Sequence, residues 1–135
     1  MRMAMPANNT NKHDKLIYRD ECYQIYSLLF KLQNELGTNF QEKHYQRAFE
    51  NLLKVEGVPY KREVSLAINY GEKFLGEFSV DFILWNKIVI EFKTVPLLNQ
   101  EYLKQTLRYL EALDLKLGLI VNFRERPLKP MRVIN

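Results

Sequence analysis

Three charged residues lie in a part of the chain that is otherwise strongly apolar. Asp81 belongs to residues 78–85, and Glu91 and Lys93 end a short segment rich in β-branched residues. A carboxylate buried in such a strand costs several kcal/mol unless a counter-charge or hydrogen bonds compensate for its burial. The spacing Asp-x9-Glu-x-Lys suggests that a metal ion and a phosphate group provide this compensation. The pattern therefore predicts metal-dependent cleavage of phosphodiester bonds.

The turn between the two segments decides whether these side chains meet. Side chains alternate along a strand, so Glu91 and Lys93 share one face. A two-residue loop would pair Asp81 with Phe92 and would place Glu91 on the opposite face. A loop with an odd number of residues, or one bulge, would make the carboxylates converge. The metal hypothesis therefore requires an odd loop or a bulge.

Convergence would give each residue a chemical role. Mg²⁺ prefers a few carboxylate oxygens and keeps several waters, so Asp81 and Glu91 would hold the ion. The main-chain carbonyl of Phe92 is a candidate further ligand. Lys93 would orient the attacking water or stabilise the charge of the transition state. The alternative is an ordinary ion pair between Lys93 and one of the carboxylates at a sheet edge.

Two helical segments carry further candidates. Gln105 and Tyr109 are four residues apart and so lie on one helix face, where Gln105 would orient the water and Tyr109 would contact phosphate. Glu42 precedes Tyr45 by three residues, and an inward carboxylate there would reach a second metal ion or its waters. The alternatives are a polar flank beside a leucine stripe for the first pair and a helix N-terminal acid for Glu42.

Hydrophobic periodicity predicts an α/β protein with the element order ααβββαβ and helices covering the faces of a sheet. The first helix presents a broad apolar face that includes Tyr23 and Phe30. The last apolar strand is expected to be internal and parallel to a neighbour, and a final edge strand is expected after it. The predicted helices are 20–36, 40–56 and 100–113, and the predicted strands are 60–70, 74–85, 87–93, 117–123 and 131–134.

Length and composition bound the function. The 135 residues, of which 47% are hydrophobic, suit a single domain over 19–135 after a disordered arm over 1–18. No apolar run is long enough to span a membrane, and one cysteine excludes an internal disulfide or a zinc cage. A reducing cytoplasm is therefore expected. The net charge of +4 is compatible with a polyanion partner, and basic residues gather near the C-terminus: Arg124, Arg126, Lys129 and Arg132.

Taken together, these residues resemble the PD-(D/E)XK nuclease superfamily, and within it the GxxExxY proteins. Asn39 stands at the glycine of the GxxExxY motif, and Val80 stands at the proline that precedes the aspartate. The matching elements run from Tyr23 to Phe123; they are Glu42 with Tyr45, Asp81, Glu91-Phe92-Lys93, Gln105 with Tyr109, and the strand Gly118 to Phe123.

The resemblance implies a restriction-endonuclease-like core with a mixed β-sheet, a Mg²⁺ or Mn²⁺ site, and hydrolysis of DNA or RNA. It also implies that Asp81 and Glu91 are metal ligands, that Lys93 is the catalytic lysine, and that Glu42 and Gln105 complete the site. Two other hypotheses stay open. One is a non-catalytic nucleic-acid-binding module that uses the C-terminal basic residues. The other is a protein-interaction domain, and a homodimer or a partner protein is compatible with each hypothesis.

Overall fold

The computed structural model describes residues 17–135 of the chain, which form three helices and five strands. The expected arm over residues 1–18 lies outside the described part except for Ile17 and Tyr18, which form a turn. The helices are α2 (Arg19–Leu36), α3 (Glu42–Glu56) and α4 (Gln100–Leu113). The strands are β1 (Tyr60–Tyr70), β2 (Lys73–Leu84), β3 (Ile88–Lys93), β4 (Leu117–Asn122) and β5 (Met131–Ile134).

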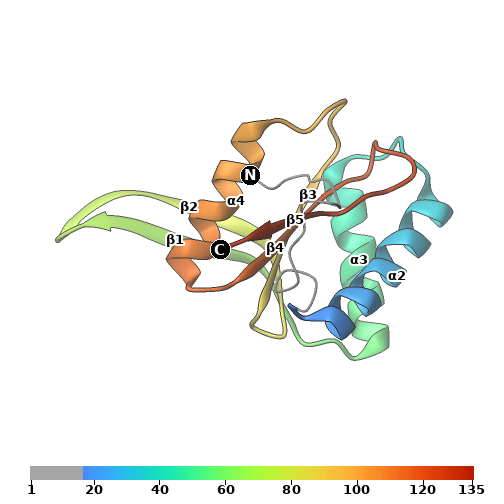
Figure 1. Cartoon of the computed structure of the whole chain (residues 1–135), viewed down its shortest axis with the longest axis horizontal. Helices are drawn as coiled ribbons and strands as arrows, with labels where there is room; N and C mark the ends of the chain where they lie inside the picture. The colour runs from blue at the N-terminus through green and yellow to red at the C-terminus, as the bar shows by residue number, and fades with distance from the viewer. Residues whose placement is uncertain (1–16) are drawn as a thin grey trace.

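The five strands form one mixed sheet whose spatial order is the order of the sequence. Strands β3 and β4 are parallel and joined through α4, whereas the other neighbouring strands are antiparallel. Helices α2 and α3 cover one face of the sheet, and α4 covers the other (Figure 1). The predicted class, element order and internal parallel strand are therefore confirmed.

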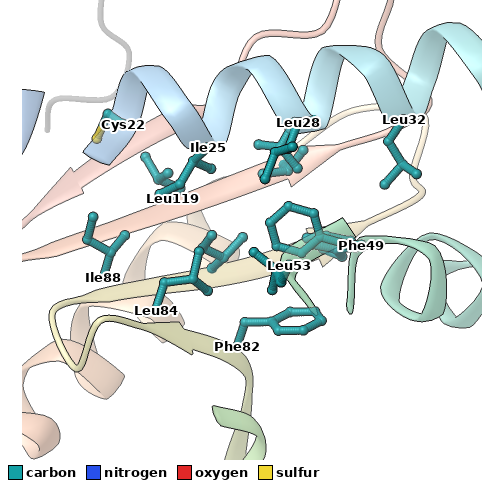
Figure 2. Close-up of a cluster of buried hydrophobic side chains, with 14 of the residues drawn as sticks. Cys22, Ile25, Leu28, Leu32, Phe49, Leu53, Phe82, Leu84, Ile88 and Leu119 are labelled. Atoms are coloured by element: carbon teal, nitrogen blue, oxygen red, sulfur yellow. The ribbon is translucent and has the colours of Figure 1, made fainter. Parts of the chain in front are cut away.

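The larger core lies between the sheet and the helix pair α2–α3. Figure 2 shows Leu28 and Leu32 of α2 and Phe49 of α3 reaching toward Phe82 and Leu119 of the sheet. Phe49 packs against Phe82 at a ring-centroid distance of 5.2 Å. These side chains are almost completely buried, so this layer holds the central strands in place.

The second core lies under α4, where the helix packs closely on β4. A Cβ atom added at Gly118 would lie only 2.8 Å from Cγ2 of Thr106, which is itself buried. Leu110 of the same helix is also within van der Waals range of that position. The absence of a side chain at Gly118 thus allows the close approach of α4 to the sheet.

The β1–β2 hairpin is longer than the rest of the sheet and projects from the body of the domain (Figure 1). Its register shifts between Ile68 and Asn69, next to the turn at Gly71. Side chains near the turn are exposed, whereas those near its base pack either against α4 or against the α2–α3 pair.

Helix boundaries agree with the predictions to within two residues, but the predicted apolar face of α2 is too broad. Tyr23 is 79% exposed and Phe30 is 42% exposed, so these aromatic rings lie outside the core. A sheet covers only one stripe of a helix, and in α2 this stripe carries Ile25, Leu29 and Leu32. None of the described helices is both long and apolar enough to cross a membrane.

Candidate active site

The turn between β2 and β3 has three residues, which is the odd loop that the metal hypothesis required. Leu84 pairs with Ile88, and Trp85 and Asn86 adopt positive φ angles of 52° and 55°. Lys87 donates a main-chain hydrogen bond to the carbonyl of Leu84 at 2.9 Å, which closes the turn. With this register, Asp81 lies opposite Glu91.

At Asp81 and Glu91, hydrogen bonds that involve the two side chains replace the main-chain ladder between β2 and β3. The regular pairing ends at Phe82 and Ile90. Beyond that pair, the main-chain N–H of Asp81 donates to Oε2 of Glu91 at 2.9 Å. In return, the main-chain N–H of Phe92 donates to Oδ2 of Asp81 at 2.7 Å. Each carboxylate is therefore held against the main chain of the opposite strand, and the two lie close together.

Strand β2 changes its packing partner at Asp81. Val80 packs in the core beneath α4, whereas Phe82 packs in the core beneath α2 and α3. On the neighbouring strand β1, Glu63 has a positive φ of 54°, which is uncommon for a residue other than glycine. Asp81 thus lies at an irregular point between the two helical layers, where its carboxylate is partly exposed rather than enclosed by one core.

The two carboxylates have unfavourable electrostatics in the absence of a cation. Burial, and secondarily the charge of Asp81, raises the pKa of Glu91 to about 8, and Glu91 is only 5% exposed. Burial also raises the pKa of Asp81, although the Phe92 N–H and the charges of Lys93 and Arg62 oppose the change. A bound cation would add a positive charge to that of Lys93 and would relieve the repulsion between Asp81 and Glu91.

Lys93 lies on the same face as Glu91 but forms no ion pair with either carboxylate among the described residues. Its Nζ instead lies 4.5 Å from the ring centroid of Tyr102 on α4, a cation–π contact. Its charge still lowers the pKa of Asp81, Glu91 and Glu42. The ion pair that was the alternative explanation for these charged residues is therefore not formed.

Glu42 is the first residue of α3, which brings its carboxylate toward the end of β3. Burial raises its pKa, Lys93 lowers it, the charge of Asp81 raises it, and a main-chain hydrogen bond from Thr94 lowers it. The charges of Lys93 and Asp81 therefore act on the carboxyl group of Glu42. The described residues nevertheless contain no group of three or more His, Cys, Asp or Glu side chains arranged to hold a metal ion.

Tyr45, three residues after Glu42, has a structural position. Its side chain is fully buried, and its hydroxyl donates to the carbonyl of Gly37 at 2.6 Å. Its ring stacks on Phe123 with a centroid distance of 4.2 Å. Tyr45 thus fixes the α2–α3 connection against Phe123, the residue after β4, and this orients the helix start that carries Glu42.

Helix α4 places its two candidates at different depths. Tyr109 is 5% exposed and stacks on Phe78 of β2 at 4.5 Å. Burial, followed by the charges of Glu91 and Asp81, raises the pKa of Tyr109 to about 12. Tyr109 therefore lies close to the carboxylates. Gln105 is half-buried one turn earlier on the same helix.

Asp81 and Glu91 have a donor set that fits a hard divalent cation. Each uses one oxygen for a main-chain hydrogen bond, and the other oxygen, Oδ1 or Oε1, has no hydrogen bond from the described residues. Mg²⁺ is commonly bound through one or two carboxylates, with water and substrate phosphate as its other ligands. A pair of carboxylates therefore meets this requirement without a third.

The basic residues of the β4–β5 connection lie beyond the end of β4. Arg124, Arg126 and Lys129 are exposed, and Arg126 donates to the carbonyl of Gln33 on α2 at 3.4 Å. Asn122, which precedes them, pairs with Lys93 across the parallel strands, so the connection begins beside the lysine of the site. Arg132 differs, because its guanidinium points inward and donates to the carbonyl of Ile17 and to Sγ of Cys22, both at 3.3 Å.

Two residues that support the site were not predicted from the sequence. Arg62 of β1 lowers the pKa of Asp81 and is held by Glu50 of α3 at 2.8 Å. Asn122 is 3% exposed and binds both main-chain groups of Val95, at 3.1 Å and 2.9 Å, which anchors the segment after Lys93. Asn122 is a polar residue in an apolar strand, the same signal that singled out Asp81.

Comparisons with known proteins bear on the family and the fold of the chain. Residues 19–134 match the family model for the PD-(D/E)XK nuclease superfamily. The crystal structure of SSO0001 is similar to the chain, with a TM-score of 0.58 and 23% sequence identity over 87% of the chain. The chain spans 61% of the length of SSO0001, and the likeness concerns the fold. A search of the curated proteins finds no match.

Proposed function

This chain belongs to the PD-(D/E)XK nuclease superfamily, and we propose that it is a Mg²⁺- or Mn²⁺-dependent nuclease that hydrolyses phosphodiester bonds. DNA is the proposed substrate, with RNA as the second choice. Within the superfamily, we assign the chain to the GxxExxY group because Glu42 and Tyr45 occupy the motif positions. The restriction-endonuclease-like arrangement of sheet and helices fits this activity.

The observation that carries the proposal is the convergence of Asp81 and Glu91. Their reciprocal main-chain hydrogen bonds fix both carboxylates while leaving one oxygen of each for a cation. A bound divalent cation would lower the pKa of its water and neutralise charge on the scissile phosphate. A structural ion pair would not require two carboxylates to face each other in this way.

Lys93 is proposed to contact the phosphate or to orient the attacking water. Because Tyr102 rather than a carboxylate holds its ammonium group, the positive charge remains available to a substrate. Glu42 is proposed to complete the metal site through water, since the nearby charge of Asp81 raises the pKa of its carboxyl group. Gln105 would position the water from α4, and the hydroxyl of Tyr109 would contact phosphate.

Arg124, Arg126 and Lys129 are proposed to bind the nucleic-acid backbone outside the site. Their position after β4 would let them hold the phosphates that flank the scissile bond. This contact is independent of sequence and should weaken as the salt concentration rises.

A cleavage assay tests the proposal. The substrates are single-stranded, double-stranded and branched DNA and single-stranded RNA, each with Mg²⁺, Mn²⁺ or EDTA. Cleavage that requires metal and is lost in Asp81→Asn and Lys93→Ala supports a nuclease. The matched controls are Asp114→Asn and Lys104→Ala, which change exposed residues of the α4 region and should retain activity. Salt-sensitive binding without cleavage, unchanged by Asp81→Asn, would instead support a non-catalytic binding module.

A further inference from the structure

Arg62 carries a positive charge beside Asp81, yet it pairs with a carboxylate outside the proposed metal site. On β1 it lies opposite Phe82, the residue after Asp81, and its guanidinium carbon lies 5.7 Å from the ring centroid of Phe82. Its Nη1 donates to Oε1 of Glu50 on α3 at 2.8 Å. Among the described residues Arg62 forms no hydrogen bond or ion pair with Asp81. Glu50 therefore sets the direction in which this charge points.

Glu50 is itself held in place from the neighbouring strand. The hydroxyl of Tyr60 on β1 donates to Oε2 of Glu50 at 2.7 Å, so both oxygens of this carboxylate are hydrogen-bonded to β1 side chains. Gln46, one turn earlier on α3, accepts from Nη2 of Arg62 at 3.2 Å. Because residues four apart share one helix face, Gln46 and Glu50 together form a fixed acceptor for the guanidinium.

The guanidinium of Arg62 is not fully satisfied in this position. Its Nε is buried and has no hydrogen-bond partner among the described residues. A buried donor without a partner costs free energy, so Glu50 and Gln46 hold the guanidinium in place against this cost. Burial raises the pKa of Asp81, and the charge of Arg62 is among those that lower it, so the two groups attract each other. Without Glu50, Arg62 would therefore be drawn toward Asp81.

A contact between Arg62 and Asp81 would compete with a divalent cation. Asp81 uses Oδ2 for the main-chain N–H of Phe92, and its Oδ1 has no hydrogen bond from the described residues. A guanidinium bound to Oδ1 would occupy the oxygen that a cation needs. Even without contact, an uncompensated positive charge at this range would repel a divalent ion. Pairing with Glu50 removes both effects.

We propose that Glu50 is a positioning residue of the metal site, which holds Arg62 away from Asp81 and neutralises its charge so that a divalent cation can bind. This inference rests on the proposed function, because it requires Asp81 and Glu91 to bind the cation. Glu50 acts through Arg62 and touches neither cation nor substrate. A pair that only joined α3 to β1 would change the stability of the fold but not the affinity for the ion.

The affinity of the full-length chain for Mn²⁺ tests the inference. The electron paramagnetic resonance signal of unbound Mn²⁺, followed in a titration at pH 8, gives the Kd without substrate or cleavage. In Glu50→Gln we expect the Kd to rise about tenfold, since an uncompensated and partly shielded charge acts on a divalent ion.

Glu21→Gln is the matched control. Glu21 pairs with Lys87 at 3.0 Å, and its side chain is 26% exposed, against 25% for Glu50. Lys87 precedes β3, whereas Lys93 of the site ends this strand, so the control pair lies at the other end of β3. Glu21→Gln should keep the wild-type Kd, and circular dichroism verifies that each variant is folded.

Two variants of Arg62 separate its charge from the stability of the fold. Arg62→Met leaves the negative charge of Glu50 and should bind Mn²⁺ more tightly than the wild type. The double variant Glu50→Gln/Arg62→Met removes both charges and should return to the wild-type Kd.

The outcomes distinguish this inference from the proposed function. A wild-type Kd in folded Glu50→Gln, weaker binding by Arg62→Met, or a double variant as weak as Glu50→Gln would overturn the role of Glu50 and leave the proposed nuclease intact. A wild type that binds no Mn²⁺ would overturn the proposed metal site and this inference together.

Discussion

Asp81 and Glu91 each accept a hydrogen bond from the main chain of the opposite strand. Oε2 of Glu91 accepts from the N–H of Asp81 at 2.9 Å, and Oδ2 of Asp81 accepts from the N–H of Phe92 at 2.7 Å. The two acids therefore act as part of the sheet and still face each other. This relationship explains how the fold tolerates two carboxylates that repel one another, and it leads to the predictions below.

We predict that Asp81→Asn abolishes cleavage while preserving the fold. The amide oxygen of asparagine can still accept the hydrogen bond from Phe92, and removal of the charge relieves repulsion on Glu91. The metal-free variant should therefore unfold at equal or higher urea concentration than the wild type, with a gain of about 1 kcal/mol at pH 8. Marked destabilisation in EDTA would contradict this and would identify Asp81 as part of a structural ion pair.

We predict that the metal-free protein loses stability as the pH rises from about 5 to about 8. Folded Glu91 keeps its proton up to a pKa of about 8, against 4.5 in an unperturbed glutamate. In this window the folded state binds more protons than the unfolded state, so the free energy of unfolding falls with increasing pH, by roughly 3 to 5 kcal/mol. Urea unfolding in EDTA across this range measures it. Glu91→Gln should flatten the curve, and an equally steep curve in that variant would show that another group is responsible.

Much of the fold could be predicted from the sequence because its patterns are local. The alternation in β1 and the helical spacing in α4 give boundaries that match the structure. The carboxylates of Asp81 and Glu91 could be selected as candidates, but their convergence could not be derived, because it depends on one additional loop residue at Trp85. Arg62 was missed for a similar reason, since its position beside Asp81 follows from the pairing of β1 with β2.

The outward position of Tyr23 also depends on long-range packing. Its spacing in α2 fits an apolar face, but α3 and the sheet occupy a narrower stripe of the helix. For Tyr45 the sequence motif gives the position without the role, because the hydrogen bond to Gly37 forms only when the connection between α2 and α3 closes.

We predict that Tyr45→Phe lowers the stability of the fold and leaves the cleavage activity unchanged. The variant loses the 2.6 Å hydrogen bond to Gly37 but keeps the ring that stacks on Phe123. The expected loss is about 1 kcal/mol in thermal or urea unfolding. Tyr23→Phe is the control, since Tyr23 is exposed and the change should be close to neutral. Loss of cleavage by a stable Tyr45→Phe variant would instead place the hydroxyl in the chemistry.

We predict that Gly118→Ala destabilises the domain by about 1–3 kcal/mol, since overpacking forces α4 away from the sheet. The new methyl group would lie 2.8 Å from Cγ2 of Thr106. Thr106→Ser removes Cγ2 of residue 106, so the double variant should recover part of the loss relative to the sum of the two single variants. Additive losses in urea unfolding would show that these two positions do not contact each other.

The central claim is that Asp81 and Glu91 form one divalent-cation site. The most direct test is a titration of Mn²⁺ up to about 10 mM, followed through the midpoint of thermal unfolding at pH 8. The wild type and the Asp114→Asn control should gain stability in a saturable manner, whereas Asp81→Asn and Glu91→Gln should gain much less. Equal stabilisation of all four proteins, or none in the wild type, would contradict the account.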